Sequence, residues 1–461
     1  MILVIDVGTT GLRAALVDET AAIRALHYRS FPPSSPAPGL VEFDATEMAR
    51  LVLEAAAAAI ADAGAEPVTT VGITNQRAST IVWDRTTGEP IAPALGWQDL
   101  RTVGECIMAK AEHGLPLAPN QSATKIGWLL ANTPGAADRD LCFGTVDSWV
   151  AWVVSEGAVH VTDHSNAAVT GLFDLDGARW SDRVCDLLGV PTAILPAIVD
   201  SSGVIGAASA LPGAPPIAAI AGDQQASMVG QGCVHAGLTK ITFGTGGMLD
   251  LCTGDGAPAS ANRTANGTFP IIAWSRGGAL TWGVEAIMLS AGTCVEWLRD
   301  DLGLIATSAE SHDVASACSS ADGVMFVPAL LGLGTPRWDY GARGTLLGVT
   351  RGTDRAHLVR AVLEGVAHRG ADMLNAAEAD TGLTIPSVRV DGGMSTNPTF
   401  VQALADATGR PVEVSPVVEA TTLGAALLAG LATGVWSGLD DVAAAWQPAQ
   451  RVEPRAPLDR A

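Results

Sequence analysis

Short apolar runs separated by glycine-rich or acidic turns open the chain. Residues 2–5, 14–17 and about 22–28 are such runs, and their spacing predicts a meander of three strands. An alanine-rich stretch follows, in which Asp44 and Glu47 have the spacing of a helix N-cap pair and Gly64 favours the end of the helix. The runs "VTTVGIT" and "STIVWD" predict further strands. This alternation of strands and helices indicates an α/β layered fold.

The second half of the chain repeats this plan. "KITFGTGGMLDLCTG" predicts a strand, a Gly/Thr turn and a strand, and it resembles "ILVIDVGTTGLRAALVD" at the start. A long helix is predicted over 354–380, a strand over "SVRVDGG" and a helix over "EATTLGAALLAGLATG". We therefore expect two α/β halves with a cleft between them: a first domain over 1–225, a second over 226–440 and a peripheral tail over 441–461.

Composition limits the classes of function. The chain has 461 residues, 48% hydrophobic and 16% charged, which is typical of a globular protein of two domains. No apolar run approaches the ~20 residues that span a bilayer, and the first residues lack a basic signal region, so we expect a cytoplasmic protein. Seven scattered cysteines without C-x-x-C spacing argue against a disulfide framework or a zinc site.

The formal net charge of −21 disfavours nucleic acid and anionic membranes as partners. The same charge repels ATP, so a nucleotide site in this chain needs positive groups or backbone N–H groups of its own.

The octet "DVGTTGLR", residues 6–13, is a candidate phosphate site. Gly8 and Gly11 permit a tight turn whose N–H groups converge, and Thr9 and Thr10 add hydroxyl donors. Asp6, at the strand end, is suited to hold Mg²⁺ directly or through water. An ordinary hairpin turn explains the octet equally well. "FGTGG", residues 243–247, offers a similar turn in the other half, and two such turns favour a phosphate clamp.

The heptapeptide "DGGMSTN", residues 391–397, lies between a predicted strand and a predicted helix. Its glycines let a flat ligand approach the backbone closely, which suits adenine or ribose. A strand-to-helix turn capped by Asn397 is the open alternative. The chain has no Walker A lysine motif and no strand-to-helix G-x-G-x-x-G, so P-loop and Rossmann sites lack their signatures.

Polar side chains also follow the apolar run "PPIAAIAG". Asp223, Gln224 and Gln225 stand where that predicted strand ends, among residues too small to cover them. A turn in which the Asp side chain accepts nearby backbone N–H groups is one interpretation. The other is a carboxylate that faces a cleft and accepts a proton from a ligand.

Nine segments in this order resemble the FGGY family of carbohydrate kinases, and within it most of all the glycerol kinase group. The segments are "DVGTT", "GITNQRASTIVWDRTTGEPI", "GWQDLRT", "SATKIGWLL", "TDHSNAAVTGLFDL", "AGDQQASMVGQ", "KITFGTGG", "VPALLGLGTPRWD" and "VRVDGGMSTNPTFVQALAD…EATTLGAALLAGL". The resemblance covers roughly residues 2–436. It implies two actin-like, ribonuclease-H-type domains that close over Mg-ATP and a polyol or sugar, and an enzyme that phosphorylates a hydroxyl group.

The resemblance also implies roles for individual residues. Asp223 matches the general base, and Asp6 lies at the metal together with Asp223. The other matched positions fall into groups: Thr9, Thr10, Arg13, Thr245 and Gly246 at the phosphates, Gly393 and Asn397 at the adenosine, and Arg77, Trp97 and Gln224 at the acceptor.

Three positions depart from the glycerol kinase pattern. Ala78 replaces a Glu that binds substrate hydroxyls, Asn120 replaces a Tyr, and Met248 replaces an aromatic residue. Loss of the Glu removes a charge-assisted hydrogen bond worth roughly 1.5–3 kcal/mol. The vacated volume leaves room for another carbon and hydroxyl that Asn120 could bind. We therefore expect a polyol or ketose as acceptor, including tetritols, pentitols and ketopentoses longer than glycerol.

Two other classes of function remain open. A nucleotide-driven switch would share the phosphate turns but lack the cluster of Arg77, Trp97 and Asp223. A degenerate sugar-binding or regulatory protein could have kept the fold and lost turnover, although Asp6 and Asp223 are intact. The sequence does not decide the oligomeric state, and a homodimer or a homotetramer is compatible with it.

Overall fold

The computed structural model describes residues 1–258, 262–455 and 458, and the chain forms two compact units. Unit 1 comprises Met1–Gly230, Ile271–Thr281 and Glu419–Ala445, and unit 2 comprises Gln231–Pro270, Trp282–Val418 and Trp446–Ala461. Two late segments thus pack with the first unit, while the domain boundaries drawn from the sequence stay a prediction. Residues 456–457 and 459–461 of the expected tail lie outside the described residues.

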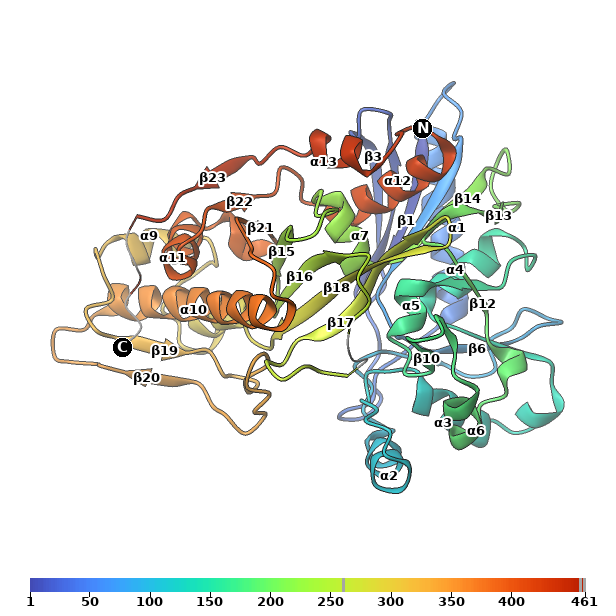
Figure 1. Cartoon of the computed structure of the whole chain (residues 1–461), viewed down its shortest axis with the longest axis horizontal. Coiled ribbons are helices and arrows are strands. Elements are labelled where there is room, and N and C mark those ends of the chain that lie inside the picture. The colour runs from blue at the N-terminus through green and yellow to red at the C-terminus, as the bar shows by residue number, and fades with distance from the viewer. Residues whose placement is uncertain (259–261, 456–457, 459–461) are drawn as a thin grey trace. The chain divides into compact units, whose positions relative to one another are not determined.

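A mixed sheet forms the centre of unit 1 (Figure 1). Its strand order is β3-β2-β1-β5-β14-β13, with bounds β1 Ile2–Val7, β2 Gly11–Val17, β3 Ile23–Ser30, β5 Thr70–Asn75, β13 Ser202–Ala207 and β14 Pro216–Gly222. β1 runs antiparallel to β2 and parallel to β5, which is parallel to β14. Every residue of β1 and β5 is buried, whereas β3 alternates between half-buried and exposed, as expected of an edge strand. The predicted opening meander is confirmed.

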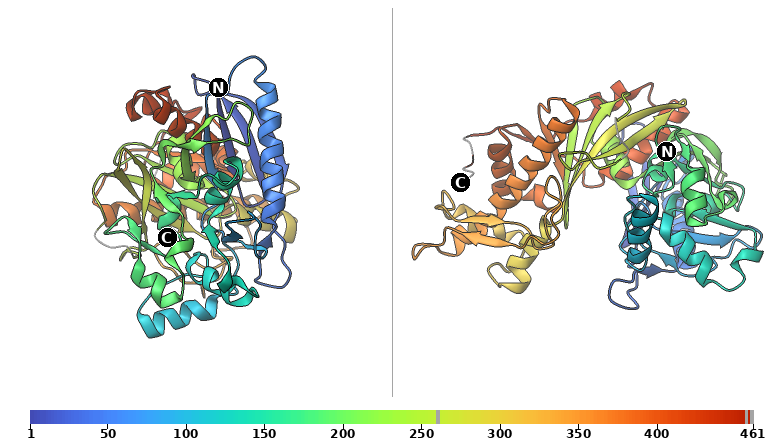
Figure 2. Two further views of the ribbon diagram at one scale, coloured as in Figure 1. Left: turned by 90° about the vertical axis from the view of Figure 1, so that its right-hand side faces the viewer. Right: turned by 60° about the horizontal axis from the view of Figure 1, so that its bottom comes forward.

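Helices cover this sheet. α1, Ala45–Asp62, begins after Asp44, whose side chain accepts from the backbone N–H groups of Thr46 and Glu47, as the sequence predicts. Its buried face packs along β1, β2 and β3 (Figure 2). The remaining helices of unit 1 are α2 Val103–His113, α3 Ala123–Asn132, α4 Val146–Val154, α5 His164–Ala168, α6 Asp182–Leu188, α7 Asp223–Gly230, α12 Ala420–Thr433 and α13 Leu439–Ala445, with short 3₁₀ turns at Ala136–Asp138 and Thr192–Ile194.

Small two-stranded sheets complete unit 1. They pair β4 Glu42–Phe43 with β7 Ala94–Leu95, β6 Ile81–Asp84 with β8 Leu141–Gly144, β9 Val161–Asp163 with β12 Ala197–Val199, and β10 Phe173–Asp174 with β11 Arg179–Trp180. β17, Phe269–Arg276, pairs with β13 through its last residue.

Unit 2 repeats the strand order of unit 1. β18 (Ala279–Met288), β16 (Gly247–Gly254), β15 (Thr239–Phe243), β21 (Val388–Asp391), β22 (Val412–Val414) and β23 (Gln450–Val452) follow one another, and β15 is antiparallel to β16 and parallel to β21. The predicted long helix is α10, Arg355–Thr381, capped by Asp354. The other elements are α8 Gly292–Glu296, a π-helical turn at Trp297–Asp301, α9 Glu310–Ser316, a 3₁₀ turn at Gly393–Thr396, α11 Pro398–Thr408, and the pair β19 Met325–Val327 and β20 Thr345–Leu347.

Two general features bear on the expected class of protein. In residues 1–258, 262–455 and 458, no helix is both long and apolar enough to cross a membrane. All seven cysteines are free thiols, and burial raises the pKa of Cys233 and of Cys294 to about 12.

Glycines bring α7 and α12 into backbone contact within unit 1. A Cβ atom on Gly424 would lie 1.7 Å from the carbonyl oxygen of Ala226, and one on Gly230 would lie 1.9 Å from that of Ala420. Because the obstacle is backbone, no side-chain rotation relieves it. This contact fixes α7, whose first residue is Asp223, against the helix that follows Glu419.

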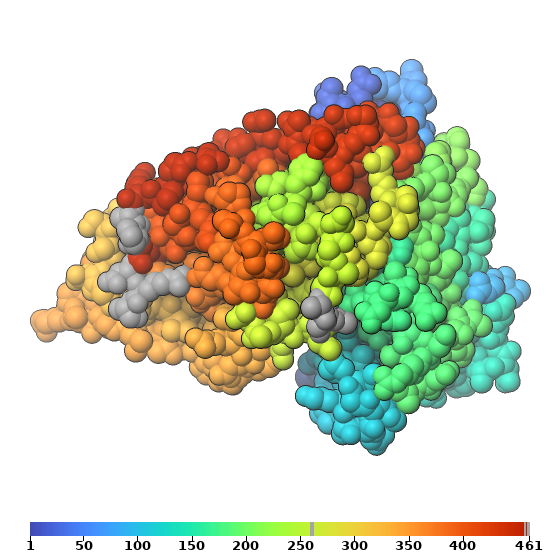
Figure 3. Space-filling view, in the orientation of Figure 1, coloured from blue at the N-terminus to red at the C-terminus, as the bar shows by residue number. Residues whose placement is uncertain are grey.

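We expect Gly424→Ala to destabilise the protein by about 1–3 kcal/mol or more, because the added methyl must push α12 away from α7. Gly104→Ala is the matched control. Gly104 lies in α2, which is at the surface (Figure 3), and a Cβ there meets nothing within 4 Å. The control should stabilise the protein by about 0.5–1 kcal/mol. Thermal unfolding of both variants measures this, and equal midpoints would contradict the contact.

Candidate active site

The predicted phosphate turn joins β1 to β2. The backbone N–H of Gly8 donates to the carbonyl oxygen of Gly11 over 2.9 Å, which closes the turn. A Cβ on Gly11 would lie 2.3 Å from the hydroxyl of Tyr28, so a larger residue there would displace the Tyr28 ring. Thr9 and Thr10 form the tip, and Thr10 is exposed. The hairpin turn is therefore present, and its threonines lie where a ligand can reach them.

Asp6 lies beneath this turn and is only 4% exposed. Thr422 of α12 donates to its Oδ2 over 2.9 Å, and Arg13 Nη1 lies 3.8 Å from the same oxygen. Arg13 also pairs with Glu419, 3.2 Å from Nε to Oε2. Burial raises the pKa of Asp6 to about 6 against the opposing effects of Arg13 and Thr422, and the like charges of Asp223 and Glu419 raise it further.

Arg77 and Asp223 meet at the ends of adjacent parallel strands. Gly222, the last residue of β14, stands opposite Asn75, the last residue of β5, so the residues that follow emerge at one edge of the sheet. Arg77 Nε lies 3.4 Å from Asp223 Oδ1. Gly222 permits this approach, because a Cβ there would lie 2.8 Å from Arg77 Cδ. The Asp223 side chain remains 32% exposed and is not enclosed in the core.

Asp223 also makes a local bond. Its Oδ1 accepts from the backbone N–H of Gln224 over 2.8 Å. The local turn interpretation drawn from the sequence is therefore confirmed, whereas a carboxylate that accepts a proton from a ligand stays a prediction. Gln224 is half-buried on the first turn of α7.

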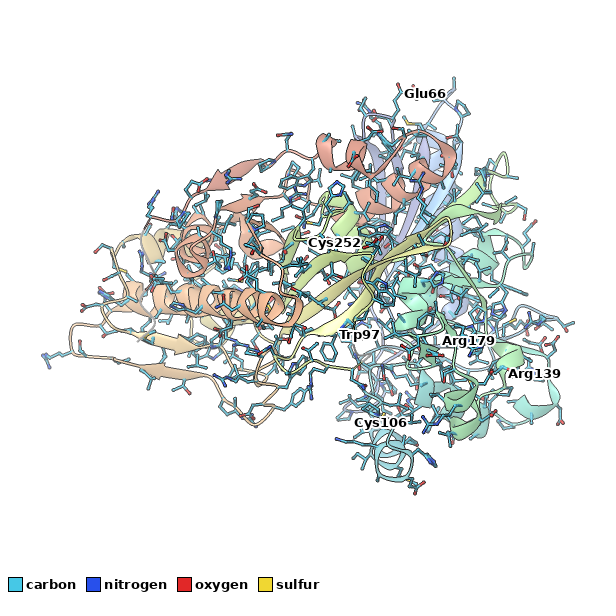
Figure 4. The ribbon with its side chains drawn as sticks, in the orientation of Figure 1. Glu66, Trp97, Cys106, Arg139, Arg179 and Cys252 are labelled. Atoms are coloured by element: carbon cyan, nitrogen blue, oxygen red, sulfur yellow. The ribbon has the colours of Figure 1, made fainter. Side chains whose placement is uncertain are left out.

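Trp97, labelled in Figure 4, brings the predicted acceptor residues to the phosphate turn. Its Nε1 donates to Thr9 Oγ1 over 3.2 Å, and its backbone N–H donates to Ser79 Oγ over 3.1 Å. Ala78, directly before Ser79, is buried with a positive φ of 60°. Thr9, Arg77, Ala78 and Trp97 thus belong to one connected cluster within unit 1.

Ser122, the N-cap of α3, and Lys125 of α3 bind the backbone of this cluster. Ser122 Oγ donates to the carbonyl oxygen of Ala78 over 3.1 Å, and Lys125 Nζ donates to those of Gly96, over 2.7 Å, and Trp97, over 3.3 Å. Burial lowers the pKa of Lys125 to about 8, against the opposing charge of Asp99.

Asn120 and Met248 are not part of this cluster as the structure describes it. Asn120 is exposed in the loop before α3, and Met248 lies in unit 2 on β16, opposite Thr242. Their predicted acceptor roles stay predictions.

The predicted nucleotide residues of unit 2 lie on two adjoining loops. Thr245 and Gly246 form the turn between β15 and β16, and the carbonyl oxygen of Thr245 accepts from Ala291 N over 2.9 Å. Gly392, with φ 85°, lies so close to this strand that a Cβ would be 2.4 Å from the Phe243 carbonyl oxygen. Gly393, the next residue, is exposed.

Asn397 caps α11, as one sequence interpretation expected. Its side chain accepts from the backbone N–H of Phe400, and its Nδ2 donates to Ser311 Oγ over 2.9 Å. A contact of Asn397 with adenosine stays a prediction.

The carboxylates of unit 1 fit a magnesium ion. Mg²⁺ is bound in proteins through one or two carboxylates and keeps several waters or phosphate oxygens. The described residues contain no group of three or more His, Cys, Asp or Glu side chains that could hold a metal ion. Asp6 and Asp223, two carboxylates close enough for the charge of one to raise the pKa of the other, are a donor set of the required kind.

Sequence reasoning missed Ser122, Lys125, Glu419 and Thr422. The motifs "SATK" and "EATT" that contain them gave no role to these side chains. A lysine inside an otherwise apolar helix was the available signal for Lys125. Nothing in the local pattern pointed from Thr422 to Asp6, which lies 416 residues away in the chain.

Comparisons with known proteins identify the family of this chain. The model of the N-terminal domain of the FGGY family of carbohydrate kinases matches residues 1–230, and the model of its C-terminal domain matches residues 239–433. The chain therefore belongs to the FGGY family of carbohydrate kinases, and it is an ATP-dependent phosphotransferase.

Its relatives include several glycerol kinases. The chain is 42% identical to the glycerol kinase of Deinococcus radiodurans, over 98% of this chain and 93% of the relative. It is 44% identical to that of Bordetella parapertussis, over 99% and 94%. Among solved structures, Plasmodium falciparum glycerol kinase with ADP matches with a TM-score of 0.92 at 29% identity, over 99% of this chain and 94% of that one. These matches confirm the expected two-domain, actin-like fold.

Asp6 yields a prediction about stability. With a pKa raised from 3.8 to about 6, its protonated form stabilises the fold at low pH, and this contribution is lost as the pH rises through 6. Asn at this position stays neutral and keeps an acceptor for Thr422. Asp6→Asn should therefore unfold with a free energy about 2–3 kcal/mol higher than wild type at pH 7, and equal to it near pH 4.

Thermal unfolding between pH 4 and 8 without ligands measures this difference. Asp176→Asn, at an exposed position of unit 1, is the control and should stay within about 0.5 kcal/mol of wild type throughout. An Asp6→Asn protein that is less stable than wild type at pH 7 would refute the assigned cost of burial.

Proposed function

We propose that this protein transfers the γ-phosphoryl group of ATP to a hydroxyl group of a small polyol or sugar, with Asp223 as the general base. The observation that carries this proposal is the contact of Asp223 with Arg77 at an accessible strand end, beside the cluster that links Trp97 to Thr9. A base, a cationic group and a phosphate turn are the parts that phosphoryl transfer needs.

In the proposed reaction, Asp223 accepts the proton of the acceptor hydroxyl. At the same time, the oxygen of that hydroxyl forms a bond to the γ-phosphorus. The bond between that phosphorus and the β–γ bridging oxygen breaks, and ADP leaves. Arg77 and Gln224 hold a neighbouring hydroxyl, and the Trp97 ring limits the space for the carbon chain. General-base assistance of this kind contributes about 10²–10⁴ in rate.

Each unit offers residues of its own that we assign to phosphate binding. In unit 1 we assign Thr9, Thr10 and Arg13 to this role. The two threonines place hydroxyl groups at the tip of the turn, and Arg13 places a guanidinium on the strand that follows it. In unit 2 we assign Thr245 and Gly246, with Gly393 and Asn397 at the adenosine. Mg²⁺ at Asp6 and Asp223 would neutralise charge on the phosphates.

Two observations bear on the acceptor. The relatives named above are glycerol kinases, which supports glycerol. Ala78, in contrast, offers no acceptor for a substrate hydroxyl next to Arg77, which supports a polyol or ketose longer than glycerol. We further propose a cytoplasmic protein and a homodimer or homotetramer.

Asp223→Asn tests the base. Asn keeps the size of the side chain and can accept from Gln224 N, but it cannot take a proton. We expect kcat to fall by about 10²–10⁴ while the Kd for ATP stays within about twofold. Asp176→Asn is the control, with wild-type kcat. A loss below tenfold would remove Asp223 from this role, and absence of product from the wild type with any polyol would favour the regulatory alternative.

A panel of acceptors tests the substrate. With an ADP-release assay across glycerol, tetritols, pentitols and ketopentoses, we expect at least one longer acceptor to match or exceed glycerol in kcat/KM. Ala78→Glu should shift the preference toward glycerol by about tenfold, because the carboxylate restores an acceptor worth roughly 1.5 kcal/mol or more. A hundredfold preference of the wild type for glycerol would reject the larger pocket.

A further inference from the structure

The motif "TDHSNAAVTG" has no part in the reaction described above, yet it lies at the centre of the site's support. Asp163 caps α5, and Ser165 and Asn166 form its first turn. All three side chains are fully buried. We call these three residues the α5 support.

The α5 support contacts the last row of the unit 1 sheet. Val7, Asn75 and Gly222 end β1, β5 and β14, and they stand opposite one another, with Asn75 between the other two. The next residues along each strand begin the phosphate turn, the Arg77 segment and α7. A shift of one strand end against its neighbours in this row would therefore move the phosphate turn, the Arg77 guanidinium and the Asp223 carboxylate relative to one another.

Asn166 and Asn75 form a reciprocal amide pair. Asn75 Nδ2 donates to Asn166 Oδ1 over 3.0 Å, and Asn166 Nδ2 donates to Asn75 Oδ1 over 3.1 Å. A second acceptor orients each amide: Asp163 Oδ1 for Asn166, over 2.9 Å, and the carbonyl oxygen of Gln76 for Asn75, over 2.9 Å. A buried amide that loses a hydrogen-bond partner still carries the free-energy cost of its removal from water. Any other orientation of either amide would therefore be less favourable than this one.

Further hydrogen bonds lead from Gln76 to the phosphate turn and the Trp97 loop, and from Ser165 to the start of α7. Gln76 Nε2 donates to the carbonyl oxygen of Gly8 over 3.2 Å, and Gln76 Oε1 accepts from Ser79 Oγ over 3.2 Å. Ser79 Oγ in turn accepts from Trp97 N. On the other side, Ser165 Oγ accepts from the backbone N–H of Gly222 over 3.0 Å, directly before Asp223.

We propose that Ser165 and Asn166 are positioning residues that fix the distance between the acceptor side of the site, at Arg77 and Asp223, and the phosphate turn at Gly8. The proposal rests on the proposed function. Transfer to an alcohol needs the reacting atoms in line and about 3 Å apart, and a misplacement of 1 Å can cost about 10² in rate. Water, which needs no placement by Arg77 or Trp97, is the competing acceptor.

Asn166→Ala tests the proposal through the ratio of ADP formed to phosphorylated polyol formed. Transfer to the polyol gives ADP and the phosphate ester, and hydrolysis by water gives ADP and inorganic phosphate. We expect kcat for transfer to fall about 10–100-fold and the ratio to rise from near one to at least two, with the Kd for ATP within about twofold of wild type. A variant that only folds less well lowers both products equally and leaves the ratio unchanged.

Thr70→Val is the matched control. Thr70 begins β5 at the end remote from the site, is fully buried, and donates a single side-chain hydrogen bond to Pro216 O over 3.1 Å. This variant should lose stability and keep the wild-type ratio. If Asn166→Ala does not fold, Ser165→Ala, which removes the acceptor for Gly222 N, decides by the same ratio.

An unchanged ratio, with kcat per folded molecule within twofold of wild type, would overturn the positioning role while leaving the kinase function intact. A wild-type protein that makes no phosphorylated product would instead end the proposed function, and this inference with it.

Discussion

The parallel register of β1, β5 and β14 is the constraint on which the site of unit 1 depends. Parallel strands deliver their carboxyl ends to one edge, and in open α/β sheets ligands bind outside those ends. The row Val7, Asn75 and Gly222 therefore decides where Gly8, Arg77 and Asp223 emerge. Gly222 adds the necessary clearance, since any larger residue would meet the Arg77 side chain. The positions of the side chains that the proposed reaction uses therefore depend first on the backbone pairing of the strands, and only then on contacts between the side chains.

Charge balance at this edge follows from the same geometry. Asp6, Asp223 and Glu419 are close enough for like charges to raise the pKa of Asp6, and the guanidinium groups of Arg13 and Arg77 pair with them. In a chain with a formal net charge of −21, an anionic nucleotide needs such local cations. Magnesium would add the remaining positive charge, which is consistent with a site where carboxylates outnumber the nearby arginines.

The two units share one strand order but differ in the residues that follow the equivalent strands. In unit 1, Gln76 and Arg77 follow Asn75, the last residue of β5, and their side chains lie in the candidate site. In unit 2, Gly392 and Gly393 follow Asp391, the last residue of the equivalent strand β21, and Gly392 lies against the backbone of β15. Side chains that hold hydroxyls suit a small acceptor, whereas bare backbone suits the flat surface of a nucleoside. The short sequence similarity between the two halves thus reflects a repeated strand topology, in which the residues after the equivalent strands differ.

The sequence predicted the elements because they are local properties, and its candidate site residues at the strand ends rest on the same kind of local signal. Periodicity marks a strand, a Gly/Thr turn marks a hairpin, and a carboxylate among small residues stands out at a strand end. The packing of α12 with unit 1 and the bond from Thr422 to Asp6 depend on contacts between distant segments. Buried helices such as α12 are apolar all round, so their pattern does not tell which face meets a partner.

Lys125 and the amide pair of Asn75 and Asn166 share a physical reason for being hidden from sequence reasoning. Each is a buried polar group that costs free energy unless its partners are placed correctly, and those partners are backbone carbonyls and side chains from other segments. A core built for stability alone would replace them with apolar residues of similar size. These groups lie directly behind the Trp97 loop and the strand ends. A buried polar group with one favourable arrangement holds such a loop in one position, and this offsets its cost. An apolar side chain makes contacts without a preferred direction and does not hold the loop in this way.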